Sequence, residues 1–179
     1  MYIPLGLIVL VIVIWILYPY IYGYIDYSRR WDEEERKAAA RIAELDALQA
    51  QGARNRAAFH EAGHVVVARF GLPVGKIEIA DDGSGKTEIG PADHLPLIDQ
   101  VAVRIAGVVA QDFFGFFRSE AGYHDQGKIV ELVDGLTEAE SLKLRNAAYE
   151  RAREIIKSQK PEVERLAELL IEKRNAGPV

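Results

Sequence analysis

The spacing of two histidines and a glutamate would allow the histidines to bind a metal ion and the glutamate to act on a water bound to that ion. The residues read His60-Glu61-Ala62-Gly63-His64, which fits the pattern H-E-x-x-H. On a helix, a spacing of four residues is close to one turn, so both imidazoles face one side and can bind a single zinc ion. The glutamate lies about 100° further around the axis, where it reaches a water on the metal rather than the metal itself. The pattern therefore predicts zinc-assisted hydrolysis with Glu61 as the general base.

A catalytic zinc site needs a third protein ligand, and the residues alone leave its identity open. Such sites generally combine three protein ligands with a fourth position for water. The longer metzincin pattern does not supply the third ligand, because Val67 and Phe70 stand where that pattern has glycine and histidine. The chain has no cysteine, so the ligand must be a histidine, an aspartate or a glutamate. The downstream candidates are Asp125, His124, Glu120, Asp134, Asp93 and His94.

The motif lies in a segment predicted to be a helix over about residues 54–70. The Gly-Leu-Pro stretch at 71–73 is a stop signal for that helix. The helix contains Gly63, which costs about 1 kcal/mol relative to alanine, so we expect another part of the chain to pass close to the backbone there. A linker helix is expected over residues 26–53, and the Gln-Gly-Ala stretch at 51–53 is expected to separate the two helices.

The rest of the chain carries one hairpin pattern followed by helix patterns. Residues 76–80 and 86–90 alternate polar and apolar side chains around a turn rich in glycine and aspartate, which predicts a β-hairpin. The predicted fold class is mainly α (α+β), a helical domain with one small hairpin. Four helices are expected after the hairpin: Leu97 to Phe114, about Gly122 to Val133, Thr137 (capping box with Glu140) to about Lys157, and a last one with Pro161 in its first turn that ends near Arg174.

The first 25 residues predict a single transmembrane helix. They contain no charged side chain, and the run from Leu5 to Leu17 is apolar apart from Gly6. A bilayer core of about 30 Å takes roughly 20 apolar residues as helix. Basic residues follow the segment and none precedes it, so the positive-inside rule places the rest of the chain in the cytoplasm. The expected organisation is a membrane anchor over 1–25, a linker helix over 26–53 and a catalytic domain over 54–179.

The overall charge argues against one class of partner. The formal net charge is −5 and the sequence pI is near 5.5. Such a chain offers no basic surface for a phosphate backbone, so we expect no nucleic-acid partner. The absence of cysteine also excludes a disulfide framework and a thiolate metal site.

Several segments resemble one family of membrane-bound proteases. Residues 58–66 (AFHEAGHVV) are similar to the zinc helix of the FtsH-type AAA+ proteases. Residues 95–115 are similar to the helix of that family that ends in a phenylalanine-glycine pattern, and two stretches near the C-terminus follow its closing helices. The resemblance covers roughly residues 54–174. It implies the fold of a zinc metallopeptidase domain.

The resemblance also implies the third ligand. Residues 121–125 (AGYHD) resemble the family's Gly-Ala-x-x-Asp element, whose aspartate binds zinc, so Asp125 inherits that role beside His60 and His64. This chain departs from the element in two ways: the Gly-Ala pair is reversed, and His124 replaces the asparagine before the aspartate.

The large AAA ATPase module of the family is missing between the predicted anchor and the protease-like segment. Fewer than 30 residues separate Ile25 from Arg54, which is too few for such a module. We therefore expect a membrane-anchored zinc endopeptidase that cleaves unfolded or flexible protein segments without ATP hydrolysis in this chain. A homo-oligomer or a separate ATPase would fit as a further partner. The alternative is a non-catalytic, membrane-tethered adaptor that keeps the peptidase fold to bind proteins.

Two other motifs compete with this interpretation. The stretch from Ala80 to Thr87 is close to a phosphate-binding loop, but it leads into a strand pattern rather than a helix, and its two aspartates would repel phosphates. Residues 133–135 (Val-Asp-Gly) resemble the aspartate motif of site-2-type intramembrane proteases. Arginines at 54, 56 and 69 bracket the histidines too closely for a helix that spans the bilayer.

Overall fold

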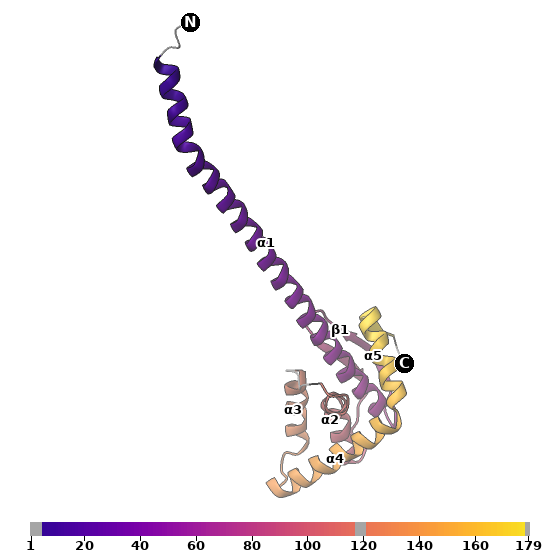
Figure 1. Cartoon of the computed structure of the whole chain (residues 1–179). Helices are drawn as coiled ribbons and strands as arrows, with labels where there is room; N and C mark the ends of the chain where they lie inside the picture. Colours follow the sequence, from indigo (N-terminus) through magenta and orange to yellow (C-terminus); the bar gives the residue numbers. More distant parts are fainter. Residues whose placement is uncertain (1–4, 117–120, 178–179) are drawn as a thin grey trace. The chain divides into compact units, whose positions relative to one another are not determined.

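The computed structural model describes residues 5–116 and 121–177 (Figure 1). The chain divides into two units, Met1–Ala47 and Leu48–Val179, and the candidate site lies in the second. The fold is mainly helical with one small antiparallel sheet, as the sequence predicts. The elements are α1 (Leu5–Ala68), β1 (Val74–Ile79), β2 (Gly85–Ile89), α2 (Leu97–Phe113), α3 (Ala121–Leu132), α4 (Glu138–Ser158), α5 (Lys160–Lys173) and β3 (Asn175–Ala176).

Helix α1 corrects one prediction, because it continues through residues 51–53 without the expected break. A single glycine inside a helix costs only about 1 kcal/mol, and Gly52 is flanked by good helix formers. The residues predicted as a linker helix and those predicted as the helix of the motif therefore form one continuous helix, which ends at Ala68, two residues before the predicted end.

Part of the predicted membrane anchor falls outside the described residues. The structure does not describe residues 1–4 or the side chains of residues 5–13, 21 and 24. Within the described part of the chain, no helix carries a stretch long and apolar enough to cross a membrane. The predicted transmembrane helix over residues 1–25 is therefore not confirmed.

Helices α1 and α2 approach each other closely at Gly63. A Cβ atom built on this glycine would lie 2.6 Å from the Cβ of Ala110 and 2.7 Å from the carbonyl oxygen of Ala106. Both distances are too short for real atoms, so only glycine fits. The expectation that another segment passes close to the backbone at this position is confirmed. The contact sets the turn of α1 that carries His60 and His64 directly against α2.

This contact predicts opposite effects for the same substitution at two helical glycines. Gly63→Ala should lower the free energy of unfolding by about 1–3 kcal/mol, because the added methyl group overpacks the interface with α2. Gly52→Ala should raise it by up to about 1 kcal/mol, because its new Cβ meets only the end of the Arg56 side chain, at 3.5 Å, and alanine favours the helix. Chemical unfolding followed by circular dichroism measures both. Equal effects of the two variants would contradict the tight contact.

The predicted hairpin forms and gains a third strand. Strands β1 and β2 pair antiparallel, with a bulge between Val74 and Ile77. The short strand β3 pairs with the other side of β1, so the order is β2-β1-β3 and β2 lies at one edge. Arg174 reverses the chain before β3 with a left-handed backbone (φ 63°), and its carbonyl accepts a hydrogen bond from the amide of Ile79. The sequence did not predict β3.

The helices after the sheet follow the sequence signals closely. Helix α4 begins with the predicted capping box, in which the Thr137 side chain accepts from the Glu140 amide and the Glu140 carboxylate accepts from the Thr137 amide. Helix α5 has Pro161 in its first turn. The core of the second unit is built from small and branched aliphatic residues of α1, α2, α4 and α5 together with β1. This core holds the last turns of α1 in place.

Candidate metal centre

The two histidines of the motif lie side by side within the second unit. His60 and His64 are buried, with 1% and 5% of their surfaces exposed. Their Nε2 atoms are 3.1 Å apart, and the ring planes are inclined by 76°. Both imidazoles therefore present the same type of nitrogen to one point, as the four-residue spacing predicts.

Helix α2 fixes the orientation of both rings. The Nδ1 of His64 lies 2.8 Å from the carbonyl oxygen of Val103, and because a carbonyl can only accept, this nitrogen donates. In the neutral ring the Nε2 of His64 then carries a free lone pair, the form that binds metals. One turn further along α2, Gly107 leaves room for the other ring, since a Cβ there would lie 2.5 Å from the Nε2 of His60.

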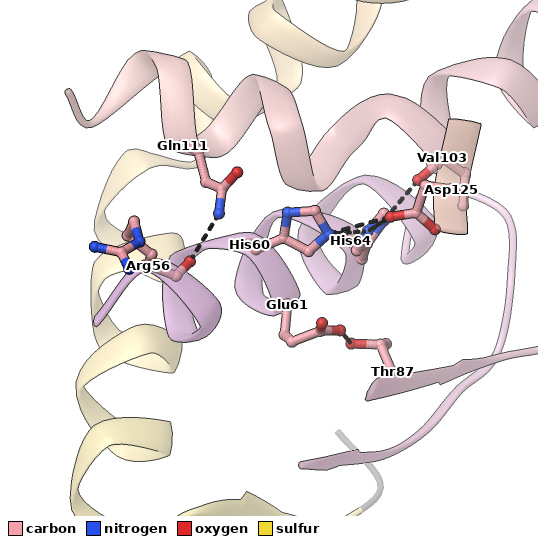
Figure 2. Close-up of polar contacts among 8 residues, drawn as sticks. All are labelled: Arg56, His60, Glu61, His64, Thr87, Val103, Gln111 and Asp125. Carbon is pink, nitrogen blue, oxygen red and sulfur yellow. Dashed lines mark hydrogen bonds and ion pairs between the residues drawn. The ribbon is translucent and has the colours of Figure 1, made fainter. Parts of the chain in front are cut away.

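Asp125 on α3 completes a group of three potential ligands (Figure 2). Its Oδ2 atom lies 3.1 Å from the Nε2 of His60 and 3.0 Å from the Nε2 of His64. About 14% of the Asp125 side chain is exposed, more than of either histidine side chain, so the group is largely shielded and Asp125 is its most exposed member. In sequence this aspartate is 65 residues from His60. The structure thus brings together the three residues that the resemblance implies.

The spacing and chemistry of these three atoms fit a zinc ion. Tetrahedral zinc with bonds of about 2.0–2.2 Å sets neighbouring ligand atoms about 3.3–3.5 Å apart, close to the distances here. The lone pair of His64 faces the Asp125 carboxylate, which is also an acceptor, so a shared cation or proton is needed to make the contact favourable. The Nδ1 of His60 is buried and has no hydrogen-bond partner among the described residues.

The electrostatics of the group point the same way. Burial by itself would raise the pKa of Asp125, but hydrogen bonds and charge from His60 and His64 outweigh it and hold that pKa well below its usual range. Burial would likewise lower the pKa of His64, but the Asp125 and Glu61 carboxylates outweigh it, so the His64 pKa is raised. The cluster therefore favours a carboxylate anion and a positive charge beside it.

The other candidates for the third ligand whose side chains the structure describes do not join this group. Asp93, His94 and Asp134 are exposed, and none belongs to the only group of potential ligands found among the described residues. His94 lies instead near the carbonyl of Gly71, at 3.4 Å. Glu120, and the side chain of His124, lie outside the described residues.

Glu61 lies next to the ligand group without being part of it. Only 4% of its surface is exposed. Its carboxylate points towards β2, where the Thr87 hydroxyl donates a hydrogen bond to its Oε2 atom at 2.5 Å (Figure 2). A buried carboxylate beside a potential metal site, but not in it, is placed as a general base needs to be.

No family model and no curated protein matches this chain.

The two competing motifs take other roles. Residues 85–87, the end of the stretch that resembles a phosphate-binding loop, lie in strand β2 and are not followed by a helix. The turn before them is the hairpin turn, closed by hydrogen bonds between Ala80 and Ser84 and between Asp82 and Ser84. Asp134, from the site-2-type motif, is exposed and follows the end of α3. Neither motif supplies a member of the group formed by His60, His64 and Asp125, although Thr87, the last residue of the first motif, contacts Glu61.

Sequence reasoning missed four residues that support the site. Thr87 contacts Glu61, Val103 orients His64, and Gly107 makes room for His60. Gln111, which is fully buried on α2, donates to the carbonyl of Arg56 one turn before His60. A glycine inside the predicted helix at 97–114 and a glutamine among its apolar residues were the available signals. The backbone carbonyl of Val103 leaves no signal in a sequence.

Proposed function

We propose that this chain is a zinc-dependent endopeptidase in which His60, His64 and Asp125 hold the metal and Glu61 is the general base. The observation that carries the proposal is the convergence of two imidazole nitrogens and one carboxylate oxygen within 3.1 Å of one another, beside a second carboxylate, that of the buried Glu61. Two histidines and one carboxylate are an established ligand set of catalytic zinc. A bound zinc ion supplies Lewis-acid polarisation of a carbonyl group and promotes deprotonation of water at neutral pH.

The chain's own residues account for the proton transfers. Glu61 takes a proton from the attacking water and later gives it to the amine that leaves, so one carboxylate serves both halves of the reaction. Its burial supports this role, because a proton held in a shielded site is passed to the substrate rather than to bulk solvent. The hydrogen bond that His64 donates to Val103 keeps the Nε2 lone pair of its ring available.

The edge strand β2 supports a substrate of extended conformation. One side of β2 pairs with β1, and its other side lies at the edge of the sheet. The side chain of Thr87, in the same strand, contacts Glu61. An extended peptide can add to such an edge through backbone hydrogen bonds, which carry little sequence preference. The substrate class would be unfolded or flexible protein segments. The stretch between Ile25 and Arg54 is too short for an ATPase module, so a substrate would have to be unfolded already or be unfolded by a separate ATPase.

Attachment to a membrane through residues 1–25 belongs to the same proposal and rests on the sequence. The uncharged N-terminal run and the basic residues after it support an anchor with the peptidase domain on the cytoplasmic side.

The proposal is tested by measuring zinc and proteolysis on the same sample. The purified full chain should contain about one zinc per chain and cleave fluorescently labelled casein. Treatment with 1,10-phenanthroline should remove the metal and abolish cleavage, and added zinc should restore it, because the three proposed ligands hold the ion. A chain that binds zinc stoichiometrically and never cleaves casein or other unfolded proteins would instead be an adaptor.

A further inference from the structure

Both oxygens of the Glu61 carboxylate contact the same strand. Oε2 accepts the hydrogen bond from the Thr87 hydroxyl at 2.5 Å, within the range of a charge-assisted hydrogen bond between a hydroxyl and a carboxylate. Oε1 lies against the backbone of Gly85, where a Cβ atom would be only 2.6 Å away. Gly85 and Thr87 are two residues apart on β2, so they point to the same face of the strand. We call this pair the β2 cradle.

The strand that forms the cradle is itself well fixed. Thr87 pairs with Ile77 of β1, which is fully buried, and Gly85 pairs with Ile79. The hydroxyl of Thr87 therefore comes from a backbone position anchored in the core. A threonine side chain also has a single χ1 angle and few rotamers, so its hydroxyl is well placed to hold a partner. The cradle links Glu61 to the same edge strand that would bind an extended peptide.

We propose that Thr87 is a positioning residue that sets the direction of the Glu61 carboxylate, with Gly85 providing the space. The inference rests on the proposed function of Glu61 as general base. A glutamate has three rotatable side-chain bonds, and a base must lie within hydrogen-bond reach of the proton that it removes. Because β2 also carries the proposed peptide-binding edge, the cradle would fix the distance between the base and the scissile peptide bond.

The kinetic test compares two replacements of Thr87 in the full, zinc-loaded chain. Thr87→Val keeps the shape and removes the hydroxyl, and should lower kcat for casein cleavage by roughly 10- to 100-fold while KM changes by less than about threefold. Thr87→Ser keeps the hydroxyl and should stay within about threefold of the wild type. Zinc content should be equal in all three proteins, since Thr87 is not a ligand.

The only other threonine in the chain gives a matched control. Thr137→Val removes the hydroxyl that caps α4, outside the site, so it should lower thermal stability and leave kcat unchanged. If Thr137→Val lowers kcat as much as Thr87→Val, the loss at Thr87 reflects stability and the inference is wrong. It is also wrong if Thr87→Val cleaves at the wild-type rate, or if Thr87→Ser is as slow as Thr87→Val.

A readout that does not depend on activity is the coupling between Thr87 and Glu61 in metal-free protein. A double-mutant cycle compares Thr87→Val in the wild type with Thr87→Val in a Glu61→Ala protein. The decrease in Tm should be larger in the wild type by about 2 °C or more, because only the wild type has the hydrogen bond to lose. Equal shifts in both backgrounds would overturn the contact. If the wild-type chain does not cleave casein, the proposed function and the catalytic part of this inference are both wrong. If the wild type cleaves casein and Thr87→Val cleaves it at the same rate, only the inference is wrong.

Discussion

Glu61→Gln should abolish proteolysis while leaving the metal in place. We expect casein cleavage to fall by roughly 10²- to 10⁴-fold, because glutamine keeps the shape of the side chain but cannot take a proton from water. Zinc content should equal that of the wild type, since Glu61 is not one of the three converging residues. The measurement is initial cleavage rate together with zinc content on the same preparation.

The matched control for this variant is Glu168→Gln on α5, an exposed glutamate far from the motif in sequence. It removes one carboxylate in the same way and should cleave casein at the wild-type rate. Undiminished cleavage by Glu61→Gln would refute Glu61 as the base. A loss of zinc together with activity would show instead that Glu61 holds the metal.

Asp125→Ala should have the second large effect, on metal affinity. Removing one of three protein ligands should weaken zinc binding by about 100-fold or more, because even the loss of a residue that only orients a ligand typically costs 10- to 100-fold. Competition with a chelating dye measures the change in Kd. Asp134→Ala, a change at an exposed aspartate after α3, should bind zinc as the wild type does.

Wild-type affinity in the Asp125→Ala protein would contradict the proposed ligand set. The next variants would then be His124→Ala and Glu120→Ala, which lie within five residues of Asp125 and were the other candidates in this part of the sequence.

The secondary structure could largely be predicted because its signals are local. The capping box at Thr137, the proline in the first turn of α5 and the alternating strands around the hairpin turn each act over a few residues, and each is present in the structure. The predicted break at 51–53 was wrong. The sequence shows the cost of Gly52 in a helix, but it does not show that the neighbouring helix-forming residues together offset this cost. Strand β3 was missed because two residues carry no periodicity, and their conformation depends on pairing with β1.

The site residues also differ in whether local sequence signals were enough to predict them. His60, Glu61 and His64 occupy one turn, so their spacing alone indicates their geometry. The position of Asp125 depends on how α3 packs, which the sequence does not show. Composition alone left Asp125 as one of several candidate third ligands, and only the family resemblance singled it out. Thr87 and Gly107 were not predicted at all, since their importance comes from side chains that approach them from another element.

The division of the proposed ligands between two helices would affect how fast a bound ion could leave. His60 and His64 belong to the core-packed end of α1, whereas Asp125 belongs to α3, a separate helix that packs against α2. A transient local opening of α3 would remove one ligand and leave the other two in place, and such openings cost less free energy than global unfolding. The residence time of the metal would then follow the opening rate of α3, so that chelators could extract it from a chain that is otherwise still folded.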